Sequence, residues 1–231
     1  MHDKLDSHRL PANSNNIELS TLKKEFETND GLITVLDIPE LCLTAGRIYG
    51  LVGPSGSGKS TLFSLLSGIL KPTQGKIDVF GNIVSDFSQR ESSDFRLRNI
   101  GFIFQNFQLV DHLTAIENVT LTAELLGLAN IEGEALLAQV GLASKAKSFP
   151  HQLSGGEQQR VAVARAFITN PKLILADEPT GNLDSVNAIK IQEHLIKLSR
   201  EYGVTVLVAT HDLDFAGKLD QVIELRAGKI A

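Results

Sequence analysis

A glycine-rich loop followed by a lysine and a serine has the residue types and spacing that bind phosphate groups. It fits the pattern G-x-x-x-x-G-K-[ST], and its residues are Gly53, Pro54, Ser55, Gly56, Ser57, Gly58, Lys59, Ser60 and Thr61. Glycines let backbone N–H groups turn toward phosphate oxygens, Lys59 adds a positive charge, and the Ser60 hydroxyl can ligate Mg²⁺. A chance glycine-rich turn is the alternative. The flanking pattern of strand and helix favours a nucleoside triphosphate site.

Two adjacent carboxylates, Asp177 and Glu178, follow the short apolar run Leu173 to Ala176 and precede Pro179. The proline prevents the strand from continuing, so the acids are expected at its carboxyl end, where α/β sheets bind ligands. Asp177 is suited to hold Mg²⁺, and Glu178, which points in a different direction, can polarise an attacking water. Two acids that simply face solvent at the end of a strand are the alternative.

The elements that must position these groups can be read from the pattern of apolar residues. Short apolar runs, 47–52, 173–176 and 204–209, predict buried strands of a largely parallel sheet, and a helix is expected to follow the phosphate loop. Segments 17–43 and 75–80 predict antiparallel strands with turns at 29–31 and 81–82. The stretch 108–169 has helical patterns, including the capping box from Thr114 to Glu117, and predicts an inserted helical lobe.

A further helix start is expected at Ser154, which forms a second capping box with Glu157. Gly155 and Gly156 leave the first backbone N–H groups of this helix uncovered, which favours an anion there. An ordinary well-capped helix is the alternative. The run 153–160, LSGGEQQR, resembles the signature motif of ABC ATPases. The resemblance covers about residues 17 to 230 and implies an ABC nucleotide-binding domain over 17–231, with its helical subdomain at about 108–169.

This resemblance implies an α/β fold class: a P-loop ABC ATPase core with an antiparallel β subdomain and an inserted α-helical subdomain. It also implies that the signature helix meets the γ-phosphate of ATP held by a second copy, in a head-to-tail homodimer with ATP and Mg²⁺ as cofactors. Ser154, Gly155 and Gly156 would then contact nucleotide. Because every needed motif is present, both sites could be built from this one chain.

Further residues lie at positions that resemble functional positions of ABC ATPases. Gln105 resembles the glutamine that joins the Mg²⁺ shell and senses the membrane partner, and His211 resembles the histidine that contacts the γ-phosphate and positions water. Asp184 resembles the aspartate that links the two sites, or it caps the following helix. Phe26 is the expected stacking partner of adenine, although it could equally be a core residue. The usual tyrosine is absent there.

The composition of the chain argues against several other classes of protein. With 22 Lys plus Arg against 27 Asp plus Glu and no long basic run, nucleic acid is not an expected partner. No stretch approaches the roughly 20 apolar residues of a spanning helix. Residues 1–16 lack the features of a signal peptide and are expected to form a flexible polar leader. Cys42, between two leucines, is expected to be a buried thiol.

The run 176–185, ADEPTGNLDS, is similar to that of the lipoprotein-release, macrolide-efflux and FtsE-type cell-division ATPases. This branch implies a transport-coupled ATPase that lies on the inner face of the cell membrane, in the cytoplasm, bound to an integral membrane permease. The permease would export or extract a lipid, lipoprotein, peptide or drug. Alternatives are an ATPase that drives mechanical signalling across the membrane, such as activation of a wall hydrolase, and a soluble ABC-type ATPase.

Overall fold

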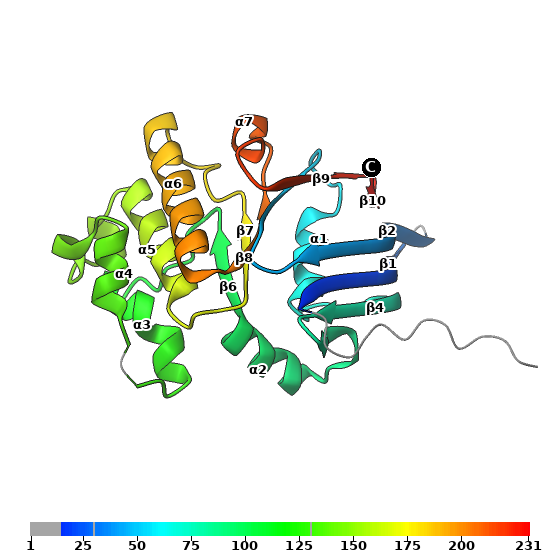
Figure 1. Ribbon diagram of the computed structural model, residues 1–231, viewed down its shortest axis with the longest axis horizontal. Coiled ribbons are helices and arrows are strands. Elements are labelled where there is room, and N and C mark those ends of the chain that lie inside the picture. Colours follow the sequence, from blue (N-terminus) through cyan, green and yellow to red (C-terminus); the bar gives the residue numbers. More distant parts are fainter. Residues whose placement is uncertain (1–14, 30, 130) are drawn as a thin grey trace, which may run out of the picture.

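The computed structural model describes residues 15–29, 31–129 and 131–231. Most of the predicted leader, residues 1–14, therefore lies outside the described residues, and the first strand begins at Asn16. Two sheets and seven α-helices make up the described part of the chain. Figure 1 shows the antiparallel strands on one side, the helices α3 to α6 on the other, and the parallel strands between them.

The parallel sheet carries the ends of the strands at which a ligand site was expected. Its strand order is β10-β9-β3-β8-β7-β6, and only β10 runs antiparallel to its neighbour. The strands are β3 (Ile48–Val52), β6 (Ile100–Phe104), β7 (Leu173–Asp177), β8 (Thr205–Ala209), β9 (Gln221–Arg226) and β10 (Lys229–Ile230). β3 and β8 are buried along their whole length, as strands covered on both faces must be.

The second sheet is antiparallel, with strand order β2-β1-β4-β5. Its strands are β1 (Asn16–Thr28), β2 (Gly31–Thr44), β4 (Gln74–Val79) and β5 (Asn82–Ile83). Thr28 pairs with Gly31 at one hairpin, and Val79 pairs with Asn82 at the other. Both predicted hairpins are therefore present, and Asp30 of the first predicted turn lies outside the described residues. One apolar cluster fills the space between this sheet, the parallel sheet and the helix after the phosphate loop.

Helices cover the opposite face of the parallel sheet and bury a second apolar cluster. The α-helices are α1 (Lys59–Leu66), α2 (Gln89–Asn99), α3 (Ala115–Leu125), α4 (Gly133–Gln139), α5 (Gly155–Phe167), α6 (Ser185–Tyr202) and α7 (Leu213–Ala216). Three short 3-10 helices are Val84–Asp86, Ala143–Lys145 and Pro150–Gln152. Within the described residues, no helix combines the length and the apolar character that crossing a bilayer requires.

Capping boxes fix the start of three helices. Thr114 and Ser154 cap α3 and α5 as the sequence predicts, and Ser88 with Glu91 caps α2 in the same way. Each serine or threonine accepts a hydrogen bond from the third helical N–H, and the glutamate at that position accepts one in return. The helix α2 was not expected, although the capping box at Ser88 is a signal that could have revealed it.

The charge in the cap of α3 should make stability depend on pH. Hydrogen bonds from Thr114, chiefly from its side chain, hold the pKa of Glu117 below its ordinary value of 4.5. A lowered folded-state pKa contributes stability above the ordinary value, and this is lost as pH falls through the lowered one. Glu117→Gln is expected to lower the melting temperature near neutral pH, and the difference should vanish in acid. A constant difference in melting scans across this range would contradict the charge effect.

Candidate functional site

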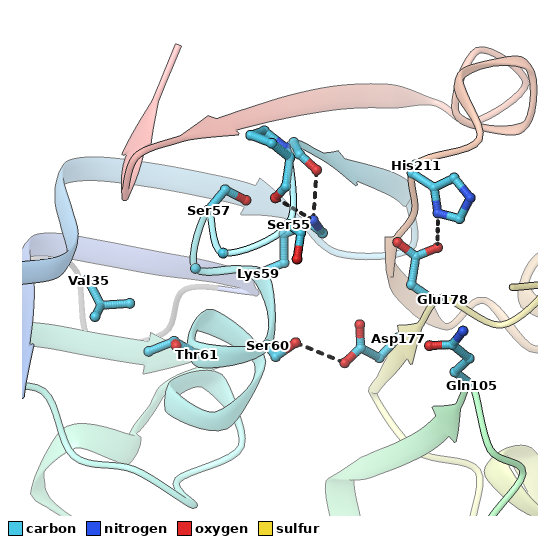
Figure 2. A pocket seen from close by; sticks show the side chains of 14 residues that line it. Val35, Ser55, Ser57, Lys59, Ser60, Thr61, Gln105, Asp177, Glu178 and His211 are labelled. Atoms are coloured by element: carbon cyan, nitrogen blue, oxygen red, sulfur yellow. Dashed lines mark hydrogen bonds and ion pairs between the residues drawn. The ribbon is translucent and has the colours of Figure 1, made fainter.

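A cleft of about 610 Å³ opens at the carboxyl ends of the parallel strands, beside the phosphate loop. Figure 2 shows that α1, the end of β7 and the segment after β8 contribute side chains to it. The residues that line it are Val35, Gly53, Pro54, Ser55, Gly56, Ser57, Gly58, Lys59, Ser60, Thr61, Gln105, Asp177, Glu178 and His211. The structure thus brings the predicted phosphate loop, both carboxylates, the glutamine and the histidine to one place.

The phosphate loop is shaped by a backbone conformation that favours glycine. Gly58 begins α1 with a φ of 107°, and a Cβ there would lie 2.6 Å from a methyl group of Leu36. Unlike α3 and α5, this helix has no side-chain cap at its start. Its first N–H groups have no partners within the helix, and the helix dipole adds positive potential at the same end. Such a helix start favours a phosphate.

Lys59 and Ser57 show that the loop has polar atoms suited to a ligand. The Lys59 ammonium donates to the backbone oxygens of Gly53 at 2.7 Å and Pro54 at 3.1 Å, so it is held over the loop. The Ser57 hydroxyl is only 3% exposed and has no hydrogen-bond partner among the described residues. An unpartnered buried hydroxyl is costly, and phosphate oxygens would satisfy it. The loop therefore fits a nucleoside triphosphate.

Oxygen ligands for a divalent cation meet in the cleft. The Ser60 hydroxyl donates to a carboxylate oxygen of Asp177 at 3.1 Å, and Gln105 lies beside them (Figure 2). Phe104 and Asp177 are partners in the sheet, which puts Gln105 next to the carboxylates. Over the described ranges, no group of three or more His, Cys, Asp or Glu side chains could hold a metal alone. The set fits Mg²⁺, which commonly takes few protein ligands together with phosphate oxygens.

Glu178 and His211 form the other polar pair of the cleft. A carboxylate oxygen of Glu178 lies 2.9 Å from Nδ1 of His211, and the glutamate side chain is 18% exposed against 75% for the histidine. Glu178 has a φ of 47°, which is unusual for a residue with a side chain, and its N–H donates to Ala209 at the end of β8. Backbone strain of this kind is concentrated at functional sites.

The start of α5 is not part of this cleft. Ser154 and Gly155 are absent from its lining, and the side chains nearest to a Cβ at Gly155 would be those of Phe107 and Leu183. A Cβ at Gly156 would lie 2.7 Å from Asn187 of α6, so this glycine lets the two helices approach closely. The predicted signature residues therefore lie together on another part of the surface.

Asp184 also lies outside the cleft. Its carboxylate accepts hydrogen bonds from the N–H groups of Val186 and Asn187 and caps α6. These hydrogen bonds, chiefly the one from the Asn187 backbone, lower the pKa of Asp184. The helix-cap alternative is thus confirmed, and it leaves a further role open because Asp184 is exposed.

Phe26 is not placed against the cleft. It lies near the end of β1 with 37% of its surface exposed, and the Lys24 ammonium lies 4.8 Å from its ring centre. Val35, on the neighbouring strand β2, lines the cleft instead (Figure 2). No feature of the sequence singled out Val35, because a half-buried valine in a strand is ordinary.

Comparisons with known proteins agree on one family. The family model described as ABC transporter matches residues 36–181. The ABC transporter ATP-binding protein YbbA of Escherichia coli is 40% identical over 225 residues, which cover 96% of this chain and 98% of that protein. The lipoprotein-releasing system ATP-binding protein LolD of Alcanivorax borkumensis is 39% identical, with 92% and 95% covered. The macrolide export ATP-binding/permease protein MacB of Rhodopirellula baltica is 41% identical over 93% of this chain, which spans 32% of that longer protein.

A solved structure gives the same result. The dimeric ATP-binding cassette MJ0796, in a post-hydrolysis state bound to ADP and Pi, matches with a TM-score of 0.82 and 37% identity. The match covers 93% of this chain and 96% of that one. The chain therefore belongs to the ABC transporter family. It is an ATP-binding subunit of an ABC transporter that hydrolyses ATP to ADP and phosphate, and its predicted α/β fold class is confirmed.

Proposed function

We propose that the cleft around the phosphate loop holds ATP and Mg²⁺, and that its residues have the roles predicted from the sequence. The phosphate loop binds the phosphates through its N–H groups, Lys59 and the Ser57 hydroxyl. Ser60, Asp177 and Gln105 hold Mg²⁺, which when bound neutralises charge on the phosphate oxygens. The observation that carries this proposal is the convergence of these groups from three distant segments on one cleft.

Glu178 is the proposed general base. Its carboxylate accepts a proton from the attacking water, and His211, 2.9 Å away, holds that carboxylate in place and faces the terminal phosphate. The adenine lies toward Val35 at the other end of the loop. Phe26 does not line this cleft, so stacking by Phe26 requires its hairpin to move toward the nucleotide.

The signature residues and Asp184 act on the nucleotide of a second copy. Within one chain, the start of α5 lies outside the cleft, yet the dipole of this helix favours an anion at its first turn. A head-to-tail homodimer would bring Ser154, Gly155 and Gly156 to the γ-phosphate bound by the partner, and would place Asp184 between the two sites. The dimeric state of the related cassette supports this arrangement.

The proposed partner is an integral membrane permease, and a second cleft offers a place for it. This cleft of about 360 Å³ lies between α2, β6, α3 and α5 and includes Gln108, which follows Gln105 closely in the chain. It is lined by the stacked pair Phe102 and Phe104, by Leu121, and by other residues among which there is no carboxylate. We propose that α3 and α5 of the helical subdomain, 108–169, form this docking surface together with α2 and β6. The MacB relative, whose name joins ATP-binding and permease functions, supports a permease partner.

Leu121→Asp should weaken docking. The side chain is half-buried in the lining of this second cleft, and a carboxylate there would have to be desolvated by an apolar partner. The expected result is a loss of about tenfold or more in permease recovered by co-purification, as for truncation of a central contact. Leu125→Asp is the matched control, because Leu125 lies on α3 but is 69% exposed and outside the cleft. Equal recovery with both variants would argue against docking here.

We further propose that the complex lies on the inner face of the cell membrane and exports or extracts a lipid, lipoprotein, peptide or drug. The test is to trap tagged Glu178→Gln with ATP and Mg²⁺ and identify co-purifying proteins from solubilised membranes by mass spectrometry. A permease with few helices and a large extracytoplasmic domain is the expected result. Recovery of soluble proteins alone would contradict the transport function, and a partner bound to a wall hydrolase would indicate mechanical signalling instead.

A further inference from the structure

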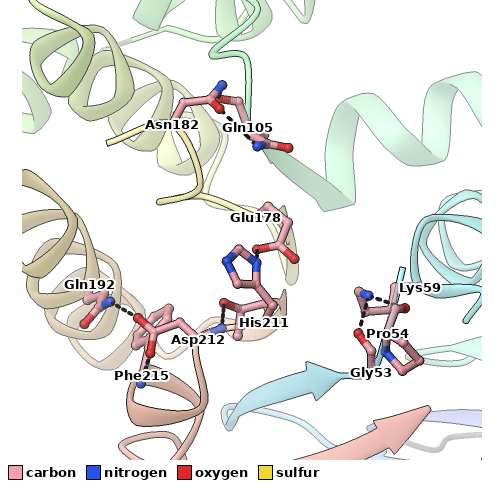
Figure 3. Close-up of polar contacts among 11 residues, drawn as sticks. Gly53, Pro54, Lys59, Gln105, Glu178, Asn182, Gln192, His211, Asp212 and Phe215 are labelled. Atoms are coloured by element: carbon pink, nitrogen blue, oxygen red, sulfur yellow. Dashed lines mark hydrogen bonds and ion pairs between the residues drawn. The ribbon is translucent and has the colours of Figure 1, made fainter. Parts of the chain in front are cut away.

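Two segments that leave neighbouring strands are joined by the side chain of Asn182. Gln105 follows β6, and Asn182 lies in the turn that begins with Glu178 at the end of β7. The Asn182 amide accepts a hydrogen bond from Nε2 of Gln105 at 3.1 Å and donates to the backbone oxygen of Gln105 at 3.2 Å. It also donates to the side chain of Asn106 at 2.8 Å. One amide thus contacts both the side chain and the backbone of the Gln105 segment (Figure 3).

Gly181 makes room for this contact. A Cβ at Gly181 would lie 2.8 Å from Nε2 of Gln105, closer than real Cβ atoms approach, so any side chain there would displace the glutamine. The turn itself is held by the Gly181 N–H, which donates to Glu178 at 3.0 Å. The fully buried Gln159 also holds this turn, because its side chain donates to the backbone oxygen of Pro179 at 2.6 Å. The turn is therefore a firm support for Asn182.

The contact sets the direction of the Gln105 amide. Because Nε2 is bound to Asn182, the oxygen Oε1 is the end of the side chain that is left for a cation. Figure 2 shows this oxygen on the side of Asp177. An exposed glutamine without such a partner would sample several rotamers and both amide orientations, and would lose entropy on binding a metal.

We propose that Asn182 is a positioning residue that holds Gln105 with Oε1 directed at the metal site. This inference rests on the proposed place of Gln105 in the Mg²⁺ shell. Partners that orient a ligand typically change metal affinity by a factor of about 10 to 100. The effect should therefore appear in metal binding itself and should depend on the presence of the glutamine.

The test uses the full chain with a bound non-hydrolysable ATP analogue and measures Mn²⁺ binding by water-proton relaxation. Mn²⁺ takes the same oxygen ligands as Mg²⁺. Asn182→Ala is expected to weaken Mn²⁺ binding about tenfold, and Gly181→Ala should weaken it in the same direction by displacing Nε2. In a Gln105→Ala background, either substitution should change binding by less than about twofold. Asn82→Ala, which removes two similar turn contacts outside the cleft, is the control.

The outcomes distinguish the proposed place of Gln105 in the metal shell from the positioning role of Asn182. If Gln105→Ala leaves Mn²⁺ binding unchanged, the place of Gln105 in the metal shell is wrong and the inference is overturned with it. If Gln105→Ala weakens binding but Asn182→Ala does not, only the inference is overturned. If Asn182→Ala weakens Mn²⁺ binding equally with and without Gln105, then Asn182 acts by another route, such as a contact with a second copy. This result also overturns the inference. Dependence of the loss on Gln105 confirms it.

Discussion

Glu178→Gln is expected to reduce ATP hydrolysis at least ~100-fold while ATP still binds, because the amide cannot accept a proton from water. Glu178 is placed for this task by three features of the structure. Its side chain lines the phosphate cleft, its carboxylate lies 2.9 Å from His211, and its backbone is fixed by the hydrogen bond to Ala209. Glutamine has nearly the same shape, so the contact with His211 and the binding of nucleotide should be retained.

Phosphate release and equilibrium nucleotide binding would be measured on the same preparation. Glu134→Gln is a suitable control, because Glu134 is an exposed residue of α4 and lies outside the phosphate cleft. Near-normal turnover of the Glu178→Gln variant would show that Glu178 is not the general base. A variant that no longer binds ATP would instead show that the glutamate supports the fold of the site.

Ser154→Arg should abolish hydrolysis without abolishing nucleotide binding by a single copy. Ser154 lies outside the cleft that is proposed to hold the nucleotide, so its replacement should leave the phosphate loop intact. An arginine at the start of α5 removes the cap hydroxyl, which costs about 1 kcal/mol, and adds bulk where the second copy's γ-phosphate is proposed to lie. The expected loss is at least ~100-fold, since catalysis would lose the stabilising helix end.

Thr114→Arg provides a matched control for this substitution. Thr114 forms the same type of capping box at the start of α3, so both changes cost similar local stability. Only the substitution at Ser154 should stop hydrolysis. If both variants lose activity to the same degree, the effect comes from the stability of the helical region. An unaffected Ser154→Arg variant would argue against a site shared between two copies.

Much of the site could be predicted because its residues sit at defined places in the fold. Asp177 and Glu178 follow an apolar run that could only be a buried strand, and parallel strands bring such ends together. The phosphate loop was predictable for the same reason, since it lies between a strand and a helix. Gln105 follows β6 and His211 follows β8, the strands on either side of β7 in the same sheet, which explains how residues so far apart in the chain line one cleft.

Predictions on the antiparallel sheet were weaker because burial there depends on register. Cys42 was expected to be buried among leucines but is exposed, since it alternates with the buried Leu43. The pattern of β1 is also interrupted at Thr21, where a positive φ of 48° accompanies a register shift against β4. Tertiary placement of this kind, like that of Phe26 outside the cleft, has no local signal in the sequence.

The central claim is that two copies share each ATP site, and sedimentation of Glu178→Gln tests it most directly. We predict a monomer without nucleotide, a dimer with ATP and Mg²⁺, and a monomer again when Ser154→Arg is added although ATP remains bound. Binding that completes a site only in the dimer must stabilise the dimer. A Glu178→Gln chain that binds ATP and stays monomeric, or one that dimerises equally well with Ser154→Arg, would contradict the account.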